Sequence, residues 1–189
     1  MDAVGNDLVW LGDPANQGRH HEDRLMGRIL CSEERRFVET AGEPHRTLWS
    51  LWAAKEAAYK AYVRTRPGSV FSPIAYRVVA GSEPCVWHAG APVPLVWDHG
   101  PDWVHALVGH NPREIVPRVE SSFSPEKASE DLRALAVRIF GEAGWPPGTI
   151  EGRPPLFWVD GRPTALAFSL SHDGPYLAVA FRSTPFRSA

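Results

Sequence analysis

The sequence predicts an α+β fold with a mainly antiparallel sheet. Three observations predict it. The run "LWSLWAAKEAAYKAY" (48–62) is strongly helix-prone, short apolar segments with Gly and Pro between them follow it, and "SLSHDGPYLAVAF" (169–181) has the alternation and turn of a β-hairpin. The order, helix before strands, occurs twice in the 189 residues and ends each time in a strand with a histidine. This length fits one domain, or two small halves that share a core.

The first third of the chain is expected to hold one strand and three helices. Apolar residues over 3–11 predict the strand, which Asn6 and Asp7 interrupt. Helices are expected over 20–30, over 32–42 and from Arg46 to Val63. In the second helix, Ser32 is the expected N-cap and Glu34 lies in the first turn, where acids are favourable. Gly42 is expected to end that helix.

The remaining chain is expected to alternate strands with one further helix. We expect strands at 75–81, 85–90, 93–97 and 103–109, a connector at 111–128, a helix that runs on to 144, a strand with turns at 150–164 and a hairpin at 165–181. Ser124 followed by Pro125 is the expected start of the helix. His172 is expected to begin the "HDGP" turn of the hairpin.

Composition excludes several classes of function. The formal net charge is −2, so no overall attraction to nucleic acid or to a membrane surface is expected. No apolar run approaches the roughly 20 residues of a membrane span, and the N-terminus lacks the features of a signal peptide. Cys31 and Cys85 have no CxxC spacing and are expected to be buried thiols. We therefore expect a cytoplasmic protein.

Two groups of charged residues could carry chemistry. Trp52, Glu56 and Lys60 share one helix face at i, i+4 and i+8, where the simpler interpretation is an exposed ion pair. Asp7 lies within an apolar strand, where a carboxylate is costly unless it pairs with an amide or an arginine, or binds a cation. If this strand runs beside the helix, Asp7 and Glu56 could share a hard divalent ion such as Mg²⁺.

The stretch "SLSHDG" contains Ser, His and Asp, but not as a catalytic triad. Neighbouring residues on a strand point to opposite faces, so Ser171, His172 and Asp173 cannot relay a proton in line. Ser169 and Ser171, two residues apart, are expected to share one face. A serine hydrolase is disfavoured also because no G-x-S-x-G is present. His172 could donate to a phosphate or cap a turn. His105 is expected to be structural, and the histidines show no zinc-type spacing.

Taken together, four motifs resemble the 4'-phosphopantetheinyl transferase superfamily. "VGNDLV" resembles its G-x-D strand, "WAAKEAAYK" its W-x-x-K-E-A-x-x-K helix, "GRPPL" its G-K/R-P-x-L turn and "SLSHDGPYLAVAF" its S-x-S-H strand. The helix motif and the S-x-S-H strand are the more specific. The resemblance implies a 4'-phosphopantetheinyl transferase-like fold of two pseudo-symmetric α/β halves.

The order of the motifs resembles a circular permutation of the two-half class. In the surfactin-synthetase-activating class, the half with GKP and S-x-S-H comes first. Here residues 1–118 would form the half with the G-x-D strand and the KEA helix, and 119–189 the half with the GRP turn and the S-x-S-H strand. The short trimeric acyl-carrier-protein synthases share this motif order but lack the intervening strands and helix. We therefore expect a monomeric pseudodimer.

The resemblance also implies a reaction and the residues that perform it. Coenzyme A would be the co-substrate, and a serine of an apo acyl or peptidyl carrier protein would attack its β-phosphorus with release of 3',5'-ADP. Asp7 and Glu56 would hold Mg²⁺, with Glu56 also the base. Lys60 would neutralise the pyrophosphate, Ser171 and His172 would contact phosphates, and Arg153 would bind the adenosine or phosphate end. Neither nucleic acid nor membrane is an expected partner.

Some assignments stay open at this stage. The two-half class often has a second acid two residues after the strand Asp, where this chain has Val9. A non-catalytic CoA- or carrier-binding relative is therefore the alternative. Lys127, Arg133 and Arg138 are candidates for the 3'-phosphate, and Lys55 has no assigned role. An early basic cluster could meet an acidic carrier or be a solvated face; it consists of Arg24, Arg28, Arg35 and Arg36.

Overall fold

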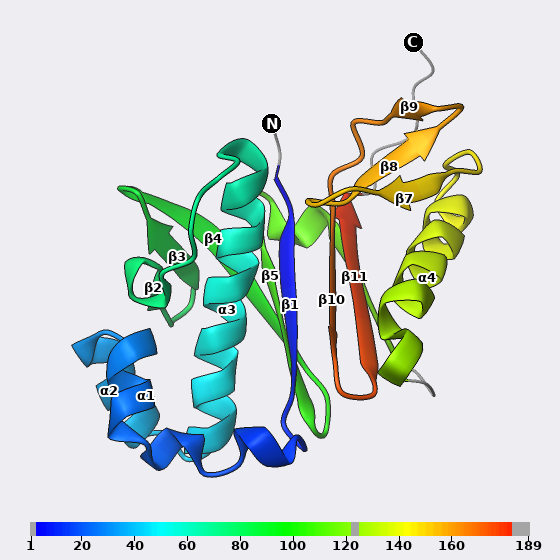
Figure 1. The fold of residues 1–189 in the computed structure, drawn as a ribbon. Helices are drawn as coiled ribbons and strands as arrows, with labels where there is room; N and C mark the ends of the chain where they lie inside the picture. The colour runs from blue at the N-terminus through cyan, green and yellow to red at the C-terminus, as the bar shows by residue number, and fades with distance from the viewer. Residues whose placement is uncertain (1–2, 122–124, 183–189) are drawn as a thin grey trace.

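A five-stranded antiparallel sheet and three helices form the first half of the molecule. The computed structural model describes residues 3–121 and 125–182. The strands, in the order β1-β5-β4-β3-β2, are β1 (Gly5–Trp10), β5 (Trp103–Val108), β4 (Ala91–His99), β3 (Cys85–His88) and β2 (Arg77–Val79). The helices are α1 (Asp23–Ile29), α2 (Ser32–Glu39) and α3 (Pro44–Thr65). The long α3 packs across this sheet, and α1 and α2 lie beside its N-terminal part (Figure 1).

Close packing between α3 and β1 depends on small residues. The buried face of α3 includes five alanines at 53, 54, 57, 58 and 61. At Gly5 on β1, a Cβ atom would lie 1.9 Å from the carbonyl oxygen of Ala57. Only glycine allows this approach, because any side chain would meet the helix backbone. The motif residues Gly5 and Ala57 therefore set the distance between the strand and the helix.

The second half has its own sheet, helix and core. Its main sheet has the order β10-β11-β6, with β10 (Phe168–Asp173), β11 (Tyr176–Arg182) and β6 (Ile115–Ser121). Helix α4 (Ala128–Glu142) packs on this sheet, with Phe140 within 5.5 Å, between ring centroids, of Phe157, Phe168 and Phe181. A smaller sheet lies above it, formed by β7 (Thr149–Glu151), β8 (Leu156–Val159) and β9 (Arg162–Pro163) (Figure 1).

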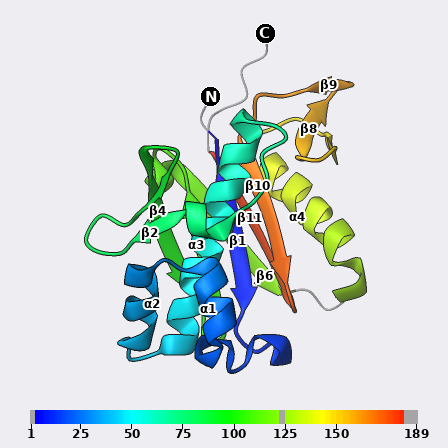
Figure 2. The same cartoon turned by 60° about the vertical axis from the view of Figure 1, so that its left-hand side comes forward.

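The two halves meet where β1 lies beside β10 (Figure 2). Strand β1 is at the edge of its sheet, so alternate N–H groups along it need partners from outside the sheet. Side chains of β10 supply them: Ser169 Oγ accepts from Asn6 N at 3.0 Å, Ser171 Oγ from Leu8 N at 3.2 Å, and Asp173 Oδ2 from Trp10 N at 2.8 Å. The period of two in both strands aligns these bonds.

The expected α+β class with antiparallel sheets is confirmed, and most elements lie close to their expected ranges. The expected connector at 111–128 is wrong, because β6 lies within it and pairs with β11. Pro117 obscured this strand in the sequence. Proline is tolerated there because β6 is an edge strand, on which a missing N–H can face outward.

Several expected boundaries are also wrong. The helix over 20–30 is a 3-10 turn at Arg19–His21 followed by the short α1. Cys31, not Ser32, is the N-cap of α2, and Glu34 reaches back to accept from Cys31 N at 2.8 Å. His172 lies in β10 rather than beginning the turn. The expected helix start at Ser124 lies outside the described residues.

Both cysteines are free thiols that are only half-buried, which corrects the expected full burial. Among the described residues, no helix has the length and apolar character needed to cross a membrane.

Candidate active site

A cleft of about 470 Å³ lies between the two halves. Its lining comprises Asp7, Leu8 and Val9 from β1, Asp13 and Asn16 from the following loop, Trp49, Trp52, Glu56 and Lys60 from α3, and Leu170, Ser171, His172 and Asp173 from β10. Asp7, Glu56, Lys60, Ser171 and His172 thus meet here, as the sequence predicted. Gly5, two residues before Asp7 on β1, lets α3 lie directly against this strand.

Asp7 is held by a compact set of hydrogen bonds. Its carboxylate is almost buried, and its Oδ1 atom accepts from Lys60 Nζ at 2.7 Å and from Ser171 Oγ at 2.9 Å. Ser171 Oγ in turn accepts from Leu8 N and from Lys60 Nζ, both at 3.2 Å. A hydroxyl has one donor and two acceptor positions, so these three bonds use its full capacity. Ser171 therefore orients both Asp7 and Lys60.

Glu56 lies in the same cleft without such support. Among the described residues, none donates a hydrogen bond to its half-buried carboxylate. Burial, and secondly the charge of Asp7, raise the pKa of Glu56 to about 7, although Lys60 opposes the change. Asp7 and Glu56 face the same cleft, in which Lys60 pairs with Asp7, and this excess of carboxylates favours the arrival of another cation.

The donor set fits a hard divalent ion with water in most of its coordination shell. In the ranges 3–121 and 125–182, no group of three or more His, Cys, Asp or Glu side chains is placed to hold a metal. Asp7 and Glu56 offer two carboxylates, and Mg²⁺ is commonly held by one or two carboxylates together with substrate phosphates. These residues could therefore hold Mg²⁺ when a phosphorylated substrate completes the site.

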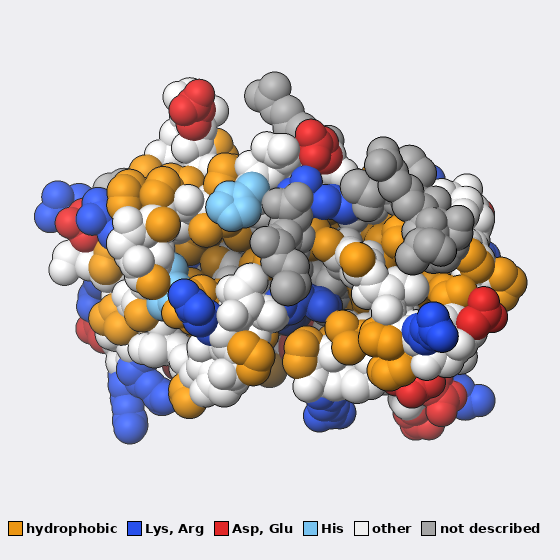
Figure 3. All heavy atoms as spheres, turned by 90° about the horizontal axis from the view of Figure 1, so that it is seen from above, with side chains coloured by type: hydrophobic (Ala, Val, Ile, Leu, Met, Phe, Trp, Pro, Cys, Tyr) orange, Lys and Arg blue, Asp and Glu red, His pale blue; other side chains and the backbone are white. Residues whose placement is uncertain are grey.

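Arg153 lies outside this cleft, in a second cleft of about 510 Å³ that shares Lys60 and Leu170 with the first. It lies in the turn between β7 and β8. Across the second cleft, Arg64 on α3 donates to Pro155 O at 3.2 Å and lies over the Phe168 ring at 5.2 Å. Burial lowers the pKa of Arg64 to about 10. Seen from above, Lys and Arg side chains lie near the middle of the molecule (Figure 3).

His172 is exposed at the rim of the first cleft, where its Nε2 lies 3.5 Å from Ser129 Oγ at the start of α4.

The three residues predicted as candidates for binding the 3'-phosphate line neither cleft. Arg138 pairs with Glu120 and Glu142, Arg133 donates to Ile150 O at 2.5 Å, and Lys127 is exposed.

Lys55 receives a structural role that the sequence did not reveal. The side chain is completely buried and pairs with Glu34 of α2 at 2.8 Å. It also donates to Pro73 O at 3.2 Å and to Tyr76 O. Glu34 accepts from Val78 N at 2.7 Å as well. This pair therefore joins α2 and α3 to the chain that enters β2, and Lys55 does not face the cleft.

Other residues were missed or placed differently. Trp49 escaped sequence reasoning; it lies three residues before Trp52, so helical periodicity could have found it on the cleft side. Trp52 packs against Phe71 at 5.7 Å between ring centroids and also lines the cleft. His105 is fully buried, as expected for a structural residue, and contacts Asn6 Nδ2 at 3.0 Å.

A family model described as the 4'-phosphopantetheinyl transferase superfamily matches residues 3–105, more than half of the chain. The chain belongs to this superfamily. The match confirms the resemblance, the fold class and the enzyme class that the motifs indicated. It includes Asp7, Glu56 and Lys60, whereas the GRP turn and the S-x-S-H strand lie outside the matched residues.

Solved structures of acyl-carrier-protein synthases are also similar to the chain. The holo-[acyl-carrier-protein] synthase of Neisseria meningitidis is 22% identical, with a TM-score of 0.47 over 58% of this chain and 98% of that one. An ACPS–CoA complex from Chronobacterium ammoniagenes is 22% identical, with a TM-score of 0.47 over 57% and 95%. The acyl carrier protein synthase of Mycobacterium tuberculosis is 27% identical, with a TM-score of 0.42 over 57% and 94%. Among curated proteins, none matches the chain.

Proposed function

We propose that this protein transfers the 4'-phosphopantetheine group from coenzyme A to a serine of an apo acyl or peptidyl carrier protein. The observation that carries the proposal is the convergence of Asp7, Glu56 and Lys60 in one cleft between the halves. These residues lie within the segment that matches the superfamily. We infer a Mg²⁺-dependent reaction that releases 3',5'-ADP.

The chemistry requires charge neutralisation and in-line placement more than covalent catalysis. The serine Oγ forms a bond to the β-phosphorus, the bond from that phosphorus to the bridging oxygen breaks, and 3',5'-ADP leaves with the electron pair. Glu56 receives the serine proton, directly or through a water. Lys60 donates to a pyrophosphate oxygen while Asp7 and Ser171 hold its ammonium. Mg²⁺ held by Asp7 and Glu56 would supply further positive charge on the pyrophosphate.

The two clefts suggest a direction for the bound coenzyme A along α3. The nucleotide end would lie in the second cleft. The lining of that cleft contains the cationic side chains of Lys60, Arg64 and Arg153 and no acidic residue. The pyrophosphate would lie at Lys60, which both clefts share. The pantetheine arm would then extend toward Trp52 and Trp49.

His172 remains the proposed phosphate contact from β10. Ser171 would reach a phosphate only by exchanging one of its present partners, so its proposed role is mainly to position Asp7 and Lys60.

An acidic carrier protein would meet the exposed Arg24 and Arg28 of α1 and Arg36 of α2. Arg35 is less available, because it already pairs with Asp23 at 2.5 Å and Glu39 at 2.8 Å.

We propose that residues 1–118 and 119–189 form the two halves, with β6 running across this division. The protein would be a monomeric pseudodimer in the cytoplasm. It would act without nucleic acid or membrane.

One observation favours a second candidate, a non-catalytic relative that binds CoA or carrier protein. Val9 lines the cleft at the position where the two-half class often has a second acid, so β1 contributes Asp7 alone beside Glu56 of α3. Retention of Asp7, Glu56 and Lys60 together favours catalysis.

The decisive experiment is to incubate the protein with CoA, Mg²⁺ and a panel of apo carrier proteins, and to weigh the carriers. A gain of one phosphopantetheine group is the expected result. Glu56→Gln should abolish transfer with the fold retained, while Glu83→Gln, a matched change at an exposed loop position, should not affect it. CoA binding without transfer to any carrier would favour the second candidate, and an unchanged rate in Glu56→Gln would refute the assignment of Glu56.

A further inference from the structure

A separate cavity of about 490 Å³ lies on the other face of α3. Successive helix residues are rotated by about 100°. Ala58, Ala61, Tyr62 and Thr65 therefore project roughly opposite to Glu56 and its neighbours in the active-site cleft. β3, β4 and the turn between them supply most of the remaining wall, and no residue of this lining belongs to either cleft described above. The cavity is large enough for a small ligand.

Aromatic rings form one wall of this cavity. Tyr76 and His88 are stacked, with ring centroids 3.8 Å apart and an interplanar angle of 10°. The Tyr62 ring meets His88 edge-on at 4.5 Å. His88 Nδ1 lies 3.0 Å from Ala75 O, and because a carbonyl only accepts, Nδ1 is the donor. This bond fixes the imidazole ring in place, so the wall is pre-formed.

The Tyr76 hydroxyl in the lining makes no hydrogen bond to a described residue. Tyr76 is only 2% exposed, and the structure gives its hydroxyl no hydrogen bond to any residue in 3–121 or 125–182. Burial raises the pKa of Tyr76 to about 12, so its phenol stays protonated at neutral pH. The Tyr76 oxygen is not among the fully buried polar atoms, so it is open to a ligand oxygen that enters the cavity.

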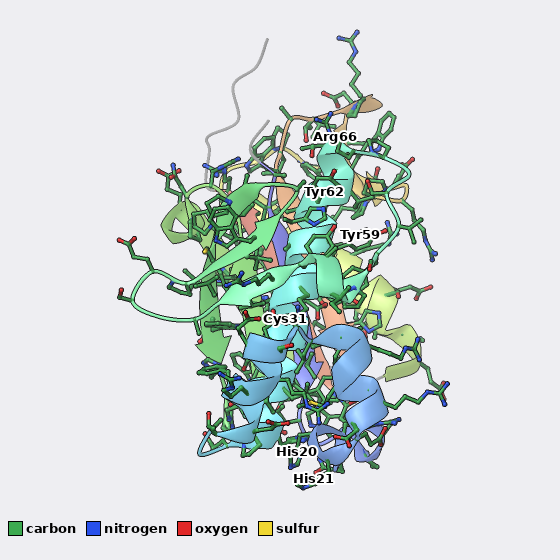
Figure 4. All side chains as sticks on the ribbon, turned by 90° about the vertical axis from the view of Figure 1, so that its left-hand side faces the viewer. His20, His21, Cys31, Tyr59, Tyr62 and Arg66 are labelled. Carbon is green, nitrogen blue, oxygen red and sulfur yellow. The ribbon has the colours of Figure 1, made fainter. Side chains whose placement is uncertain are left out.

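The polar residues in the rest of the lining are cationic or neutral. The lining contains Arg66 and His110, both exposed, and no Asp or Glu. Tyr62 and Arg66 lie near the C-terminal end of α3 (Figure 4). An anionic group of a ligand would find its partner at Arg66.

We propose that this cavity binds a small aromatic carboxylate. The aromatic ring lies against Tyr76, Tyr62 and His88, the carboxylate pairs with Arg66, and a polar substituent on the ring bonds to the Tyr76 hydroxyl. Aromatic side chains favour offset or edge contacts with another ring, and the apolar walls formed by Ala58, Ala61 and Val93 exclude water from it.

The test uses two probes, 6-hydroxy-2-naphthoate and 2-naphthoate, titrated into the protein by isothermal calorimetry. We expect the hydroxylated probe to bind one-to-one with a Kd of about 100 μM or below. Tyr76→Phe should weaken it about fivefold and leave 2-naphthoate unchanged. Arg66→Gln should weaken both probes by about threefold. Arg24→Gln, a matched change on α1, should alter neither.

A filling variant tests the position of the site. Val93→Phe places a ring inside the cavity and should weaken both probes at least about tenfold. If Val93→Phe does not fold, as judged by thermal unfolding, Ala91→Phe at the exposed start of β4 replaces it. Saturating CoA should leave both affinities unchanged.

Four results would overturn the proposal. The first is that neither probe binds, and the second is that the hydroxylated probe binds wild type and Tyr76→Phe equally well. The third is that CoA displaces the probes, and the fourth is that decanoate binds more tightly than either probe. None of them depends on whether the protein transfers phosphopantetheine.

Discussion

The change Lys55→Met separates a structural from a chemical role for the lysine beside Glu56. Lys55 occurs within the KEA motif, yet its ammonium is completely buried against Glu34 and two backbone carbonyls rather than in the cleft. We therefore expect Lys55→Met to lower the free energy of unfolding strongly. We also expect it to leave the transfer reaction intact in molecules that remain folded.

The magnitude follows from what the substitution leaves behind. Methionine fills the space of the lysine chain, but the carboxylate of Glu34, only 3% exposed, loses its counter-charge. Removing one partner of a buried ion pair typically costs about 3–5 kcal/mol. With an m-value of about 2 kcal/mol per molar, the urea midpoint should fall by about 2 M. Glu34 keeps the N–H groups of Cys31 and Val78, which holds the loss within this range.

Urea unfolding followed by circular dichroism measures the stability, and the carrier mass assay measures transfer in the absence of urea. The double variant Lys55→Met with Glu34→Gln removes the stranded charge and should be more stable than Lys55→Met alone by about 1 kcal/mol or more. Lys60→Met is the comparison: its side chain is 30% exposed, so it should lose transfer with a smaller loss of stability. A wild-type urea midpoint for Lys55→Met, or lost transfer with a wild-type fold, would refute the reasoning.

Three further changes test the packing that builds the site. Gly5→Ala should destabilise the fold by about 3 kcal/mol or more in urea unfolding, because its Cβ would lie 1.9 Å from Ala57 O; wild-type stability would contradict this contact. Ser169→Ala should cost about 1–3 kcal/mol by leaving the N–H of Asn6 unpaired, and a neutral effect would argue against the joint between the halves. Burial, and secondly Lys60, lower the pKa of His105 to about 3 from an ordinary 6.5. As the pH falls from 6.5 toward 3, the unfolded chain binds a proton at His105 and the folded chain does not. The free energy of unfolding therefore falls in this pH range, by up to about 1.4 kcal/mol per pH unit. His105→Gln should flatten the decline measured between pH 7 and 5, and an unchanged slope would oppose it.

The candidate site was largely predictable because its residues occur within short motifs. Helical periodicity placed Glu56 and Lys60 on one face, and the cost of a carboxylate in an apolar strand singled out Asp7. Strand alternation also placed Ser169 and Ser171 on one face, and the structure extends this face to Asp173. The partner of that face, the free edge of β1, lies more than 160 residues away in the chain, so no local pattern could reveal it.

Other features depended on contacts distant in sequence. Pro117 made β6 look like a connector, since proline disfavours strands unless an edge position makes its missing N–H harmless. Lys55 and Glu34 are 21 residues apart on different helices, and either could have been solvated. Burial of the pair is decided by how α2, α3 and β2 pack together.

The sequence by itself determined the α+β class, the superfamily motifs and the cleft-facing sides of α3 and β10, because period and residue type act locally. Only the tertiary structure decided that Ser171 holds Asp7 and Lys60, that Lys55 is a buried support, and that Arg153 lies in a cleft adjoining Lys60. Those outcomes depend on the packing of the two halves, where burial and hydrogen-bond capacity determine which polar groups pair with each other and which remain to meet a ligand.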